Sequence, residues 1–85
     1  MSFNDKQTSE SIASLASAVL LDAKASVIGK KLAGSALAQS STNKQTGAEM
    51  ESLASQILRE NNHSQSVLRL AGSVLAQANK ERQST

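Results

Sequence analysis

The octapeptide LAGSALAQ at residues 32–39 returns, with a single substitution, as LAGSVLAQ at residues 70–77. Extended outward at the same offset of 38 residues, the comparison places SLAS of residues 14–17 on SLAS of residues 52–55. Between residues 14–39 and their counterparts 52–77, 13 of 26 positions are identical. Agreement of this kind indicates an internal duplication, and a repeat of this length accommodates two helices with their turns.

Apolar residues recur at helical spacing in both segments of each copy, so that each segment carries one apolar face. The first segments carry the stripes Ile12, Leu15, Ala16, Val19, Leu20 and Met50, Leu53, Ala54, Ile57, Leu58. The second segments carry the stripes Leu32, Ala33, Ala36, Leu37 and Leu70, Ala71, Val74, Leu75, Ala78. The pattern therefore predicts helices over 8–23, 27–40, 47–60 and 65–80.

These four helices predict an all-α fold, a tandem repeat of two helix pairs arranged as a bundle. We expect one domain over residues 1–85, with repeats at 8–45 and 46–83. The stretches 1–7 and 79–85 are polar at the two ends of the chain and are expected to fray.

Helix-start signals precede several of these segments. Thr46 and Glu49 have the spacing of a capping box, in which the threonine accepts from first-turn amides and the glutamate reaches back. Thr8 occupies the equivalent place in the first copy. Ser26 and Ser64 are also equivalent, and each is expected to cap the second helix of its copy.

Glycine occurs inside both second helices, at Gly34 and Gly72, and each is followed four residues later by alanine. Gly29 adds a third small position in the first copy. A glycine in a helix costs roughly 1 kcal/mol relative to alanine. We therefore expect a neighbouring helix to use the space at Gly34 and Gly72.

Residues 26–39, with two lysines followed by LAGSALAQ, resemble a helix pair that recurs in small bacterial proteins of unknown function. The resemblance covers both copies and is clearest at residues 32–39 and 70–77. It implies a bacterial origin and a helical structure, and it carries no activity, cofactor or site residue.

Composition narrows the class of protein. The chain has no cysteine, tryptophan, tyrosine or proline, which excludes disulfides and cysteine-based zinc sites. Residues 1–10 are polar, and no apolar stretch approaches the roughly 20 residues of a membrane span. We expect a cytoplasmic protein without a membrane partner.

Catalytic signals are weak. The single histidine, His63, follows Glu60 by three residues in a predicted turn, and the pair lacks further metal ligands and a positioned nucleophile. The sequence therefore predicts no catalytic residue, no metal site, no cofactor and no enzymatic activity.

The two copies differ in where they keep bulky apolar residues, because the first copy has Leu21, Val27 and Ile28 where the second has polar side chains. The second copy in turn keeps Val67 and Leu68. This asymmetry favours a protein–protein interaction module that forms a homo-oligomer or binds an unknown protein. The predicted interface residues are Leu20, Leu21, Val27, Ile28, Val67 and Leu68.

The alternative function is a small DNA-binding accessory protein, because helix, short turn, helix is the outline of a DNA-reading motif. Its contacts would be Lys30, Lys31 and Arg69, which belong to the second helices. The formal net charge of only +2 and the absence of the usual residue spacing around the turn disfavour nucleic acid as the partner.

Overall fold

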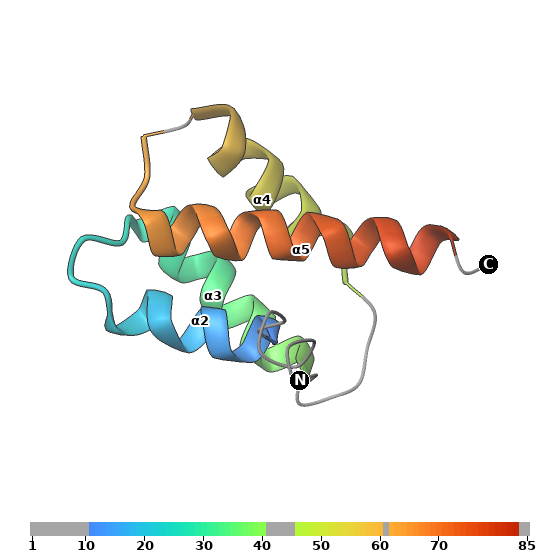
Figure 1. Ribbon diagram of the computed structural model, residues 1–85, viewed down its shortest axis with the longest axis horizontal. Coiled ribbons are helices and arrows are strands. Elements are labelled where there is room, and N and C mark those ends of the chain that lie inside the picture. Colours follow the sequence, from blue (N-terminus) through green and yellow to red (C-terminus); the bar gives the residue numbers. More distant parts are fainter. Residues whose placement is uncertain (1–10, 41–45, 61, 84–85) are drawn as a thin grey trace, which may run out of the picture.

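The structure is a computed structural model that describes residues 11–40, 46–60 and 62–83. Within these ranges the chain is all-helical, as predicted, and forms a bundle-like arrangement of four helices (Figure 1). The helices are α2 (Ile12–Leu21), α3 (Val27–Ser40), α4 (Ala48–Glu60) and α5 (Gln65–Gln83). None of them has the length and apolar character of a membrane span.

The helices are arranged as two hairpins. The first hairpin is α2 with α3 and the second is α4 with α5, and these two pairs make the most extensive contacts. Between the hairpins, α5 packs on both α2 and α3, and α3 packs on α4, whereas the described parts of α2 and α4 make no contact. In Figure 1, α5 lies across the middle of the molecule, with α4 on one side and α2 on the other.

The core is built from small and medium aliphatic side chains, most of which belong to the predicted stripes. Val67 joins the core from outside the stripes, and Leu20 and Leu58 of the stripes are exposed. Leu32, Ile57 and Leu70 are the largest side chains that are fully buried. Besides Gly29/Val67, five pairs of positions separated by 38 residues are buried at both positions: Ala16/Ala54, Val19/Ile57, Leu32/Leu70, Ala33/Ala71 and Ala36/Val74. The faces that the helical spacing selected are therefore the faces that pack together.

Serines begin the helices of the first hairpin. The Ser11 hydroxyl accepts from the N–H of Ser14 at 3.1 Å, so α2 starts at Ile12, inside the predicted range of 8–23. Thr8, the predicted cap, lies outside the described residues. The Ser26 hydroxyl accepts from the N–H of Gly29 at 3.1 Å, which confirms Ser26 as the cap of α3.

The predicted capping box at the start of α4 is wrong. Gly47 is the residue whose carbonyl accepts the first helical hydrogen bond, from the N–H of Glu51 at 3.1 Å. Thr46 therefore precedes the cap, and its N–H and hydroxyl donate to the carboxylate of Glu81, at 3.0 and 3.4 Å. Glu49 is exposed. A carboxylate does serve this helix start, but it comes from α5.

The C-terminal boundary also differs from the prediction. Residues 79–83, expected to fray, continue α5 as far as Gln83. Glu81 explains the difference, because it accepts from Thr46 and from the amide of Gln77 and so ties this part of α5 to the start of α4. Residues 84 and 85 lie outside the described part of the chain.

The glycines do not behave as predicted. A Cβ added at Gly34 or Gly72 would meet nothing within 4 Å, so no neighbouring helix in the described part of the chain uses the space. Gly29 is the glycine at a close approach, because a Cβ there would lie 2.7 Å from Cγ2 of Val67. The close helix contact is therefore between α3 and α5 at Gly29, one turn or more before Gly34.

Candidate functional site

Three of the six predicted interface residues form an exposed group around the turn between α2 and α3. Leu21 and Val27 are each 87% exposed, and Leu20 is 42% exposed. We call Leu20, Leu21 and Val27 the apolar edge. Among the described residues Leu58 is the only other large hydrophobic residue that is exposed, and it lies on α4 at the position equivalent to Leu20.

The other three predicted interface residues belong to the interior. Val67 is fully buried and is part of the core, which removes it from the predicted interface surface. Ile28 and Leu68 are half-buried and pack against the core. The sequence pattern could not separate these residues from the apolar edge, because both groups are aliphatic and lie near a turn.

Asp22 fixes the turn that separates Leu21 from Val27. Its backbone N–H donates to the carbonyl of Val19 and ends α2, and its carbonyl accepts from the N–H of Ala25 at 3.0 Å. Its Oδ1 accepts from the N–H of Lys24 at 2.9 Å. An aspartate that accepts from a backbone N–H two residues ahead forms a compact turn.

The second carboxylate oxygen of Asp22 ties this turn to the other hairpin. Oδ2 accepts from the hydroxyls of Ser64 at 2.8 Å and Ser66 at 2.6 Å, at the start of α5. The Ser66 hydroxyl, followed by the Lys24 N–H and the Ser64 hydroxyl, holds the pKa of Asp22 below its ordinary value, because these donors stabilise the charged form. Ser64 thus lies at the start of α5, as predicted, but its hydroxyl is directed to Asp22.

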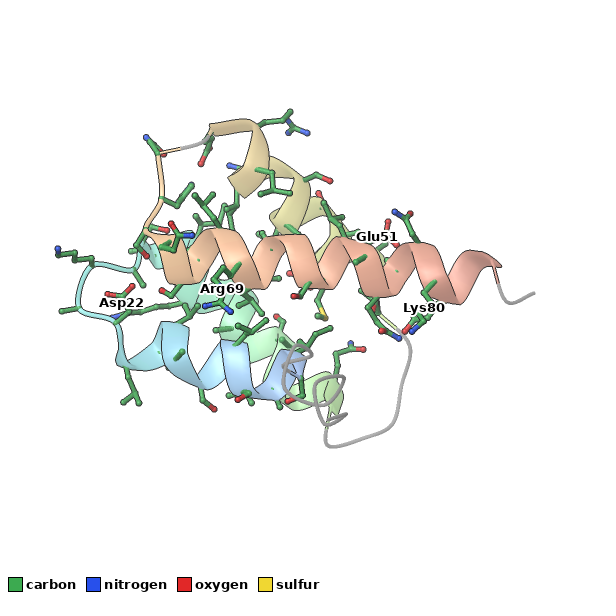
Figure 2. All side chains as sticks on the ribbon, in the orientation of Figure 1. Asp22, Glu51, Arg69 and Lys80 are labelled. Atoms are coloured by element: carbon green, nitrogen blue, oxygen red, sulfur yellow. The ribbon has the colours of Figure 1, made fainter. Side chains whose placement is uncertain are left out.

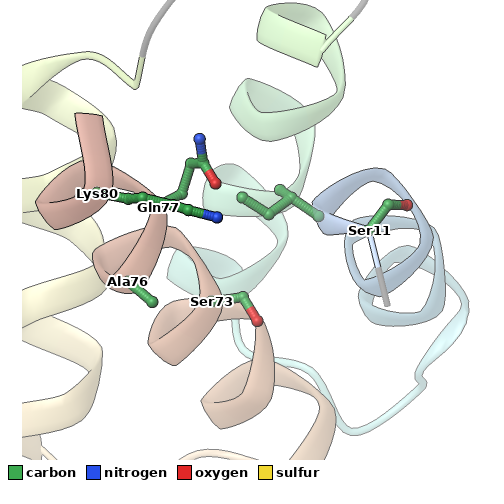
Figure 3. A pocket seen from close by; sticks show the side chains of 6 residues that line it. Ser11, Ser73, Ala76, Gln77 and Lys80 are labelled. Carbon is green, nitrogen blue, oxygen red and sulfur yellow. The ribbon is translucent and has the colours of Figure 1, made fainter. Parts of the chain in front are cut away.

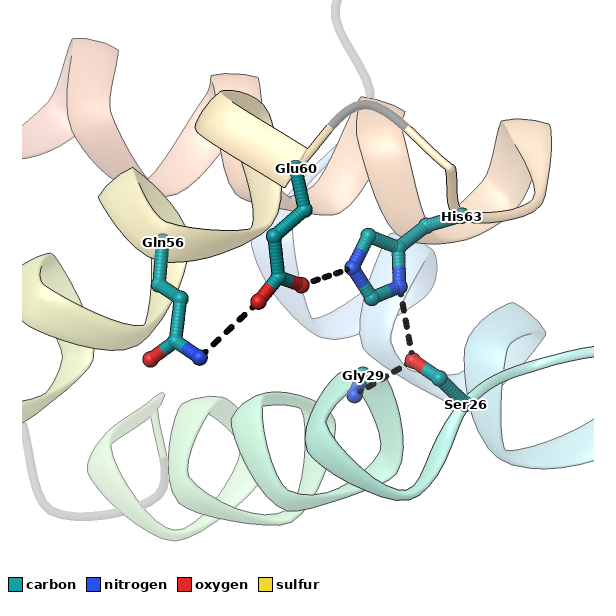
Figure 4. Close-up of polar contacts among 5 residues, drawn as sticks. All are labelled: Ser26, Gly29, Gln56, Glu60 and His63. Carbon is teal, nitrogen blue, oxygen red and sulfur yellow. Dashed lines mark hydrogen bonds and ion pairs between the residues drawn. The ribbon is translucent and has the colours of Figure 1, made fainter.

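A histidine bridge forms a second link between the turns (Figure 4). His63 Nδ1 lies 2.8 Å from the hydroxyl of Ser26, and Nε2 lies 2.7 Å from Oε1 of Glu60. The amide of Gln56 donates to the other oxygen of Glu60 at 3.1 Å. The His63 side chain is only 5% exposed, so this turn residue is enclosed.

The hydrogen-bond pattern around His63 has one arrangement that satisfies every group with a neutral ring. Ser26 Oγ accepts from the N–H of Gly29, so its hydroxyl proton is free to be donated to Nδ1. The proton on Nε2 is then donated to the carboxylate of Glu60. Gln56 and then His63 lower the pKa of Glu60 below its ordinary value.

Serine, histidine and glutamate in this order also occur in acyl-transfer enzymes, where the histidine takes the serine proton. Here the serine oxygen caps α3, and the three side chains join two turns. Sequence reasoning missed Ser26 as a partner of His63, because the two residues are 37 positions apart and no local spacing connects them. Among the described residues, no cluster of three acidic, histidine or cysteine side chains could hold a metal ion.

A surface pocket of about 400 Å³ lies at the other end of α2, where the start of that helix faces α5 (Figure 3). The lining residues are Ser11, Ile12, Ser73, Ala76, Gln77 and Lys80. Lys80 is the only charged residue among them, and it is exposed. The lining therefore provides hydroxyl and amide groups but no enclosed charge for a ligand.

The residues of the alternative DNA-binding function lie on two helices. Lys30 and Lys31 are exposed on α3, and Arg69 is exposed on α5. Successive helix residues point about 100° apart, so Lys30 and Lys31 are directed to different sides of α3. Figure 2 shows Arg69 well separated along α5 from Lys80. The described cations thus come from several parts of the surface.

Comparison with known proteins adds no relative, since no protein-family model, curated protein or solved structure matches this chain.

Proposed function

We propose that this chain is a non-enzymatic interaction module that self-associates through the apolar edge of Leu20, Leu21 and Val27. The observation that carries the proposal is the exposure of Leu21 and Val27, 87% each, in a chain whose other aliphatic residues are mostly packed. Scattered single apolar residues are ordinary on a surface, whereas Leu21 and Val27 flank one short turn, with Leu20 next to Leu21 on α2.

The polar contacts behind the edge support this proposal. Asp22 and Ser26 lie between Leu21 and Val27, and each is hydrogen-bonded to the second hairpin. The two exposed side chains are therefore held on a turn whose backbone is fixed before a partner arrives. A surface that is ordered in advance loses less conformational entropy on binding.

Burial energies set the expected strength of association. Removing a leucine or valine side chain from water contributes roughly 2 kcal/mol. Loss of translational and rotational freedom on association opposes this by at least about 4 kcal/mol. A twofold contact between the apolar edges of two chains would bury these residues in both chains. We therefore expect a weak dimer that forms as the protein concentration rises.

Light scattering after gel filtration, over a wide concentration range, tests the proposal. The expected result is a molar mass that rises from that of the 8.9 kDa chain toward twice that value. The double variant Leu21→Ser/Val27→Ser should remain a monomer with unchanged helix content, because neither side chain is in the core. A wild-type chain that stays monomeric at every concentration would remove the self-association function.

Leu58→Ser is the matched control. Leu58 is exposed to 39%, close to the 42% of its equivalent Leu20, but it belongs to α4 and not to the turn between α2 and α3. Its replacement should leave the dimer intact. Equal loss of the dimer in this control and in the double variant would show that general surface hydrophobicity, and not the apolar edge, drives association.

A further inference from the structure

Position 29 and position 67 are equivalent in the two copies, and they face each other where α3 meets α5. Gly29 is buried and Val67 is fully buried. A Cβ at position 29 would lie 2.7 Å from Cγ2 of Val67 and 2.9 Å from Cγ1, closer than unstrained side chains approach. A side chain at position 29 is therefore incompatible with valine at position 67 in this packing.

This arrangement distinguishes the two hairpins from each other. If the first hairpin met a second first hairpin in the same geometry, two glycines would face each other and leave a void. If two second hairpins met, two valines would occupy space that accommodates one. Voids and overpacking both destabilise a close-packed interior. The contact fits only when unlike hairpins meet.

The polar links between the turns also oppose the pairing of two first hairpins. Asp22 of the first hairpin accepts from Ser66 of the second, and the residue equivalent to Ser66 in the first hairpin is Ile28. Glu60 of the second hairpin reaches Ser26 only through His63. The residue equivalent to His63 is Ala25, which cannot form a bridge. Pairing of two first hairpins would lose the bonds that Ser66 and His63 make, whereas pairing of two second hairpins is opposed by the contact at Val67.

We infer that the two hairpins are complementary halves that pair only with the unlike half, and that a second copy of this chain can supply either half by exchange. The contacts at Gly29, Asp22 and Ser26 all join one hairpin to the other. A hairpin from another copy presents the same atoms, so reciprocal exchange reproduces each contact twice in a dimer. This surface is separate from the apolar edge.

Two complementary variants test the exchange. Gly29→Val places two valines in one chain, and Val67→Gly leaves two glycines in the other, so each chain alone is mismatched. Unfolded in urea and refolded together, the two chains should form a 1:1 dimer in which every valine faces a glycine. Light scattering and capture through a tag on one chain report its composition, and its urea midpoint should exceed that of either variant alone.

The same experiment is carried out in the Leu21→Ser/Val27→Ser background. Self-association through the apolar edge then cannot be confused with exchange of hairpins. A single chain with both Gly29→Val and Val67→Gly is the matched control, and it should regain the urea midpoint of the parent. A Cβ at position 29 would also lie 3.1 Å from the Ser26 hydroxyl, so this control also measures whether the cap of α3 accommodates a side chain there.

The inference is overturned if each variant alone has the parent's urea midpoint, or if the mixture contains only the two separate chains. Where the valine and glycine variants do not fold in either form, the milder pair Gly29→Ala and Val67→Ala repeats the test with smaller changes in volume. Absence of the mixed dimer from that pair as well overturns the exchange.

Discussion

At the scale of single residues, the three helical glycines differ in what surrounds them, and their replacements should have opposite effects. Gly34→Ala and Gly72→Ala should each raise the free energy of unfolding by about 1 kcal/mol, because alanine favours the helix and the added Cβ meets open space. Gly29→Ala should lower the free energy of unfolding, because its Cβ meets Val67. Urea denaturation of the three variants measures the effects. A destabilised Gly34→Ala monomer would contradict the conclusion that position 34 faces open space.

Asp22 gives a second prediction at this scale, on pH. Its pKa in the folded chain is below the ordinary value, so its contribution to stability is present above the unfolded pKa of about 3.9 and is lost as the pH falls through the folded pKa. Asp22→Asn removes the charge and leaves one acceptor oxygen for the Lys24 N–H and the Ser64 and Ser66 hydroxyls. The variant should be less stable than wild type at pH 7, and the difference should shrink below pH 4.

Denaturant titrations of both chains from neutral to acidic pH check this prediction, and Glu49→Gln serves as a control that also removes one exposed carboxylate. A difference between wild type and Asp22→Asn that stays constant down to the most acidic pH would show that the carboxylate charge does not stabilise the turn.

At the scale of the elements, the start of α4 depends on the end of α5. Glu81→Ala should increase the exchange rate of the Thr46 amide with solvent deuterium, because that N–H donates to the Glu81 carboxylate. Nuclear magnetic resonance detects the change at this single amide. Glu49→Ala is the matched control, since the sequence alone assigns the capping role to Glu49. Faster exchange in the control and not in Glu81→Ala would restore the local capping box.

Specific hydrogen bonds between the two hairpins come from the turns. Within the helices, stripes of leucine, valine and alanine select the buried faces, and only volume is matched. At the turns, Asp22, Ser26 and His63 each contact a residue of the other hairpin. These contacts fix how the hairpins are paired, while the aliphatic stripes supply the burial that stabilises the pairing.

At the scale of the whole molecule, charge gives a prediction about nucleic acid. The formal net charge is +2, and the described cations Lys30, Lys31 and Arg69 lie on two helices. We expect no retention of duplex DNA on the immobilised chain at low salt, because binding requires several phosphate contacts. Retention that falls steeply with added salt, and that is lost in Lys30→Ala/Lys31→Ala, would instead support the alternative function.

The sequence by itself determined the helices and their buried faces. Helical spacing of Leu15, Val19, Leu32 and Leu70 is a local signal, because each helix buries one face whatever its neighbour is. The sequence predicted both ends of α3 and α4 and the start of α5 to within a few residues. It also identified Ser26 as a cap, because the N–H from which its hydroxyl accepts is only three residues away.

Only the tertiary structure decided which helix ends and side chains meet. Glu81 displaced Glu49 at the start of α4, Ser26 joined His63, and Gly29 met Val67, each across more than 30 residues of chain. It also placed Val67 in the core while leaving Leu21 and Val27 exposed. Residue spacing records which side of a helix is apolar, whereas the partner of that side depends on how the hairpins pack.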